Sequence, residues 1–165
     1  MSYWIGLPLL VLAALTEVSV LPMFRLYGLQ PNLVLVMLIA WLIVRGSGEA
    51  FILAPIGGVL LGFVDGAPVG TALIGLAPLA FLQDLRGSQL REGGLIAAIA
   101  FTIVMSLFYN FVHLGVFTIL GEAGEWGAAS LRIIVPTVFL NVAILLPAYW
   151  LLTLARPEER RTVYI

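Results

Sequence analysis

Few residues in this chain could do chemistry, because only 10% of its 165 residues are charged and it has one histidine and no cysteine. An aspartic dyad needs two carboxylates about 3 Å apart. The two aspartates, Asp65 and Asp84, are predicted to lie on opposite sides of a membrane, so they cannot form such a dyad. One histidine without cysteine makes neither a zinc set nor a thiol triad, and no glycine-rich phosphate loop follows a strand. We therefore expect no enzyme, no metal site and no cofactor.

Four polar side chains interrupt otherwise apolar segments: Glu17, Asn110, His113 and Asn141. Ionisable and amide groups inside the membrane are costly and therefore indicate function by default. Asn110 and His113 are three residues apart and share one helix face. We predict that these four side chains line a polar pocket able to hold a lipid headgroup or a small polar molecule. The alternative, favoured for the two asparagines, is that they form hydrogen bonds between helices.

The elements that would position these residues are transmembrane helices. With 62% hydrophobic residues, the composition lies far outside that of soluble domains. The sequence predicts an all-α integral membrane protein with six transmembrane helices in one bundle, at about residues 3–22, 31–44, 50–64, 69–83, 94–120 and 131–155. The second to fourth runs are short for a bilayer core of about 30 Å, so a re-entrant pair at 50–83 stays open. A net charge of −1 indicates no nucleic-acid partner.

The distribution of arginine predicts the orientation. Six crossings with both termini in the cytoplasm put six of the eight arginines inside and two outside, the bias expected of cytoplasmic segments. Residues 1–155 would then form the six-span domain, and 156–165 a short cytoplasmic tail containing mixed charges. The segment 83–92 is expected as a cytoplasmic loop. In this topology the four polar side chains lie in the outer half of the membrane.

A small residue occurs at every fourth position of the third span, at Ala50, Ala54, Gly58 and Gly62. Residues with this spacing share a helix face, on which another helix can approach closely, as in small-xxx-small motifs. The stripe is expected to pack a helix, either a partner's or one of the same chain. The following residues, Asp65, Gly66, Pro68 and Gly70, are expected to form a turn.

The block from QPNLVLVMLIAWLIVRG through GGVLLGFVDGAPVGTALIGLAPLAFL, residues 30–82, resembles the rod-shape-determining MreD family. The features that carry the resemblance are Pro31 and Asn32 opening the second span, Arg45 and Gly46 closing it, and the glycine-rich helix that leads into the turn. The family often has Asp where this chain has Asn32, and an acid one turn before the Gly-x-Pro turn, where this chain has Gly62.

The resemblance implies a non-enzymatic subunit of the cell-wall elongation machinery in the bacterial inner membrane. Such proteins are thought to bind the bitopic protein MreC, and with it to link the MreB filament to the SEDS glycosyltransferase and its transpeptidase. The family is also similar in fold to the six-helix substrate-binding subunits of energy-coupling-factor transporters. The alternative function is therefore a substrate-binding subunit of a vitamin or metal transporter.

Overall fold

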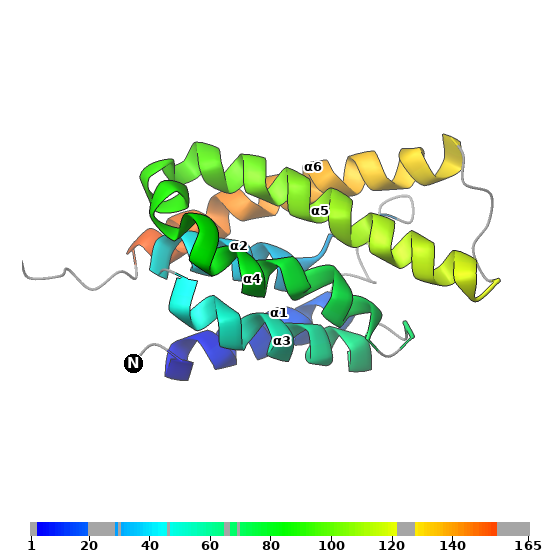
Figure 1. The fold of residues 1–165 in the computed structure, drawn as a ribbon, viewed down its shortest axis with the longest axis horizontal. Helices are drawn as coiled ribbons and strands as arrows, with labels where there is room; N and C mark the ends of the chain where they lie inside the picture. The colour runs from blue at the N-terminus through cyan, green and yellow to red at the C-terminus, as the bar shows by residue number, and fades with distance from the viewer. Residues whose placement is uncertain are drawn as a thin grey trace, which may run out of the picture.

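The computed structural model describes residues 3–19, 29, 31–45, 47–64, 67, 68, 70–121 and 128–154, with side chains left undescribed at 3, 47–50, 64, 82–92 and 128–130. This part of the chain is all helical and contains α1 (Tyr3–Ser19), α2 (Leu33–Arg45), α3 (Ser47–Val64), α4 (Thr71–Glu92), α5 (Gly94–Ile119) and α6 (Ala128–Leu154). Each helix runs antiparallel to the one before it, so α1 begins and α6 ends at the left of Figure 1. The predicted all-helical architecture is confirmed.

The loop predicted for the segment 83–92 is wrong. The sequence predicts a loop there, because the segment is polar and contains Gly87, but the helix of α4 continues to Glu92. Most of its residues, such as Gln, Leu, Arg and Glu, are good helix formers, and one glycine costs only about 1 kcal/mol. The chain then reverses at Gly94, whose φ of 54° suits a glycine.

Helix α2 is the centre of the bundle. It packs against all five other helices, and every residue from Leu38 to Val44 is buried. A helix that is apolar on all sides belongs in such a position, because it has no polar face to present elsewhere. At its C-terminal end the guanidinium of Arg45 lies 5.4 Å from the centre of the Trp41 ring, a cation-π contact.

The outer helices expose large apolar side chains. Trp4 on α1, Phe63 on α3, Ile96 on α5 and Phe139 on α6 are all exposed. In the described residues, 94–119 and 131–154 are long and apolar enough to cross a membrane, and only 28% and 22% of their most apolar stretches are buried. Core helices of a soluble protein would be mostly buried, so the exposure favours a lipid-facing surface. The other apolar helical stretches have 10–17 residues, and six crossings therefore stay a prediction.

Candidate functional site

The polar centre of the molecule is the buried N-terminus of α2. Asn32 caps this helix, because its side-chain oxygen accepts the N–H of Leu35 at 2.7 Å. From α1, Oε2 of Glu17 accepts the N–H of Val34 at 3.2 Å. Glu17 is only 3% exposed. A helix N-terminus favours negative charge and has unpaired N–H groups, which explains how an acid is accommodated at this depth.

Asn141 lies on α6 and connects the N-terminus of α2 to α5. Its Oδ1 accepts the backbone N–H of Asn32 at 2.8 Å, and its Nδ2 donates to Oγ of Ser106 on α5 at 2.9 Å. Asn110 instead donates to the backbone oxygen of Ser106, one turn earlier on its own helix. The two asparagines therefore differ, since Asn141 bonds across helices and the Asn110 bond is internal to α5.

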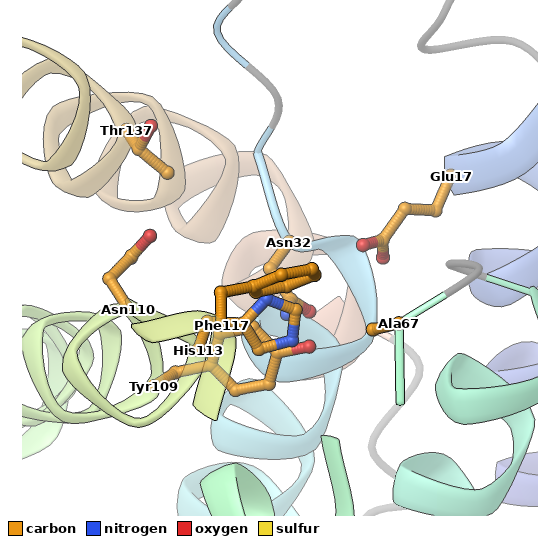
Figure 2. A pocket seen from close by; sticks show the side chains of 8 residues that line it. All are labelled: Glu17, Asn32, Ala67, Tyr109, Asn110, His113, Phe117 and Thr137. Carbon is orange, nitrogen blue, oxygen red and sulfur yellow. The ribbon is translucent and has the colours of Figure 1, made fainter. Parts of the chain in front are cut away.

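A cavity of about 240 Å³ opens beside the capped N-terminus. Its walls come from five places in the chain, and Figure 2 shows the carboxyl group of Glu17 directed across the cavity toward the side chains of α5. Its lining residues Glu17 and Asn32 place the cavity at the end of the bundle where α1 ends and α2 begins. Its described lining residues are Glu17, Asn32, Ala67, Tyr109, Asn110, His113, Phe117 and Thr137.

One wall of the cavity is aromatic. Tyr109, His113 and Phe117 follow at intervals of four on α5 and so share a face. The rings of Tyr109 and His113 stack at 4.8 Å, and those of His113 and Phe117 lie 5.9 Å apart. The Tyr109 ring also lies against Gly75 of α4, where a Cβ atom would come within 2.6 Å of it.

Of the predicted pocket residues, Glu17, Asn110 and His113 line this one cavity, whereas Asn141 lies next to it and holds Asn32. The prediction missed Thr137, and it missed the two aromatic residues that lie beside His113 on α5. The spacing of four residues from His113 could have indicated Tyr109 and Phe117. The resemblance places Asn32 only at the opening of the second span, although its position just before the apolar run is the signal for a helix cap.

The small-residue stripe divides into an internal part and an open part. Ala54 is buried, and a Cβ on Gly58 would approach the backbone Cα of Leu73 to 2.7 Å, so these positions pack within the chain. Gly62 has nothing within 4 Å of an added Cβ. The side chain of Ala50 lies outside the described residues. The predicted partner face is therefore internal at Gly58, because α4 occupies it.

The turn after α3 is described in part. Asp65 and Gly66 lie outside the described residues, as does the side chain of Asp84. Both the N–H and the hydroxyl of Thr71 donate to the oxygen of Pro68, at 3.1 and 2.9 Å. Gly70 has a φ of 97°, which residues with a side chain rarely adopt. The chain thus reverses directly from α3 into α4.

A second hollow, of about 280 Å³, lies between α3 and α4 and is apolar. We call it the hairpin groove, and its lining residues are Gly58, Val59, Gly62, Phe63, Gly70 and Leu73. The exposed side chains of Val59, Phe63 and Leu73 form its rim. The absence of side chains at Gly62 and Gly70 leaves the hollow open.

Among the residues that the structure describes, no three histidine or carboxylate side chains converge to hold a metal ion. Comparison of the chain with protein-family models, with curated proteins and with solved structures gives no match.

Proposed function

We propose that the chain is a non-enzymatic membrane scaffold that holds the single transmembrane helix of a partner protein against α3 and α4. The observation that carries the proposal is the hairpin groove, which is apolar and open at Gly62. Helices in lipid gain little from burying apolar surface, so they associate where small residues permit close packing. Gly62 provides such a place, because no atom lies within 4 Å of the position that a Cβ atom would take.

The proposed setting is a six-span arrangement in the bacterial inner membrane with both termini in the cytoplasm. The antiparallel helix order supports it, since α1 begins and α6 ends at the same end of the bundle (Figure 1). The shortness of α2, which is about 20 Å long, is compatible with it. Because α2 is enclosed by other helices, its length need not match the lipid.

The resemblance of residues 30–82 to MreD proteins supplies the identity proposed for the partner. That partner is an MreC-like bitopic protein, and the assembly is the cell-elongation machinery with its MreB-like filament, SEDS glycosyltransferase and transpeptidase. The cap at Asn32 and the turn at Gly70 give physical roles to two features of that resemblance.

Photocrosslinking in native membranes tests the scaffold proposal. A benzophenone amino acid at Gly62 should capture a single-span protein, which mass spectrometry identifies. Gly115 on α5 is the matched control, because it too has nothing within 4 Å of an added Cβ but lies outside the groove. Capture of the same protein from both positions, or of lipid alone from Gly62, would contradict a specific helix site.

A second candidate is a substrate-binding subunit of a small-molecule transporter, which the polar cavity at Glu17 favours. Such a subunit should bind a cytoplasmic coupling protein and keep its ligand during purification. A scaffold should instead retain the bitopic partner. Identification of the proteins and small molecules that copurify with the full chain separates the two functions.

A further inference from the structure

We infer that the cavity beside Glu17 binds a primary ammonium group, as a free small amine or as the headgroup of an aminophospholipid. This inference does not depend on the scaffold proposal, because the cavity and the hairpin groove share no lining residue. The argument rests on the charge of the cavity, on its hydrogen-bonding atoms and on its size.

The charge of the cavity opposes an anionic ligand. Glu17 supplies a buried carboxyl group, and His113 is the only described lining residue that can carry a positive charge. A helix N-terminus ordinarily attracts anions through its unpaired N–H groups. Here the N–H groups of Asn32, Val34 and Leu35 are already bound, by Asn141, Glu17 and Asn32. An anion would therefore meet the carboxyl group of Glu17 and would not find those donors.

Two further polar side chains of the lining provide acceptor atoms. Asn110 donates one amide N–H to the backbone oxygen of Ser106, and its carbonyl oxygen is directed toward Thr137 (Figure 2). The hydroxyl of Thr137 donates to the backbone of Ile133 and so offers only its lone pairs. The carboxyl group of Glu17, the amide oxygen of Asn110 and the hydroxyl oxygen of Thr137 are all lining acceptors to which a primary ammonium group, with its three N–H donors, can donate.

The aromatic wall suits the same ligand. The face of the Phe117 ring carries negative electrostatic potential, which attracts cations within about 6 Å. The volume of about 240 Å³ is below the range of roughly 300–1,000 Å³ typical of drug-sized ligands. The cavity thus fits a short amine or a headgroup rather than a large cofactor.

Calorimetric titration of the full-length protein in detergent tests the inference, with ethanolamine as the probe. Choline, which is a cation without N–H donors, inorganic phosphate and glycerol are the comparison probes. Ethanolamine should bind at least about tenfold more tightly than each of them, because one unmade charged hydrogen bond costs about that factor. Equal or tighter binding of phosphate, glycerol or choline, or no binding of ethanolamine together with no retained aminophospholipid, would overturn the inference.

Two variants locate the site. Glu17→Gln keeps an oxygen that can accept the N–H of Val34 but removes the charge, and it should weaken ethanolamine binding at least about tenfold. Ala67→Leu fills the cavity without changing a polar group, and it should also weaken binding, which keeps the test valid if the first variant misfolds. Gly62→Leu, in the hairpin groove, should bind ethanolamine as the parent does. Undiminished binding by a folded Glu17→Gln or Ala67→Leu variant would show that the amine binds elsewhere.

Native mass spectrometry then identifies the source of the ammonium group. The protein is extracted from vesicles that mix phosphatidylethanolamine with phosphatidylglycerol. Retention of phosphatidylethanolamine by the parent, and its loss from Ala67→Leu, supports a lipid headgroup. Ethanolamine binding without retained lipid supports a free amine.

Discussion

The side-chain oxygen of Asn141 lies 2.8 Å from the backbone nitrogen of Asn32 and accepts its N–H, which joins α6 to the start of the central helix. Asn141 is 1% exposed, so this bond is buried in the folded protein. The same amide donates to Ser106. One side chain thus connects α2, α5 and α6.

Replacing Asn141 with leucine should therefore destabilise the protein. A buried N–H left without an acceptor costs about 1–3 kcal/mol, more than the average of about 0.6 kcal/mol for side-chain bonds between membrane helices. The matched control is Asn110→Leu, which loses a bond only within α5 and should cost less. Reversible unfolding in mixed micelles measures both. Equal losses would mean that the bond between α6 and α2 contributes nothing specific.

Glu17 should matter to folding as an acceptor more than as a charge. Glu17→Leu leaves the N–H of Val34 unpaired and should lower the unfolding free energy by about 1–3 kcal/mol. Glu17→Gln keeps an acceptor oxygen, so its loss should be the smaller. The ranking is checked by unfolding titrations of the two variants beside the parent. Greater damage from glutamine than from leucine would argue against the helix-cap role.

The order of the helices was predictable because apolar runs separated by polar residues indicate helices without reference to partners. The position of α2 at the centre was not, although it follows from its packing against all five other helices. In a soluble protein, the polar face of a helix indicates which side is exposed. In lipid both the buried and the exposed faces are apolar, and the sequence loses that signal.

The candidate site was predictable by residue type but not by arrangement. Glu17, Asn110 and His113 could be selected because polar groups are costly in apolar helices. Glu17 accepts a hydrogen bond from the backbone N–H of Val34. Almost every residue has a backbone N–H, so the residue types could not indicate this contact. The division of the glycine stripe likewise depends on where α4 lies, since Gly58 meets Leu73 and Gly62 meets nothing.

Two glycines of that stripe should respond oppositely to alanine. A Cβ at Gly58 would lie 2.7 Å from the backbone Cα of Leu73, so Gly58→Ala must separate α3 from α4 and should cost about 1–3 kcal/mol. Gly62→Ala meets no atom within 4 Å and should be neutral or stabilise by up to about 1 kcal/mol, through helix propensity. Thermal unfolding of both variants measures the contrast. A neutral Gly58→Ala variant would contradict the close packing of the hairpin.

Gly75 should be needed for the aromatic wall of the cavity. A Cβ there would lie 2.6 Å from the Tyr109 ring, which is buried and stacked on His113, so the ring has little room to move. Gly75→Ala should therefore destabilise the protein by about 1–3 kcal/mol. The double variant Gly75→Ala with Tyr109→Leu removes the clashing ring, and its loss should be smaller than the sum of the two single losses. A double-mutant cycle from unfolding titrations measures this coupling. Strict additivity would show that the cost of the alanine arises elsewhere on α4.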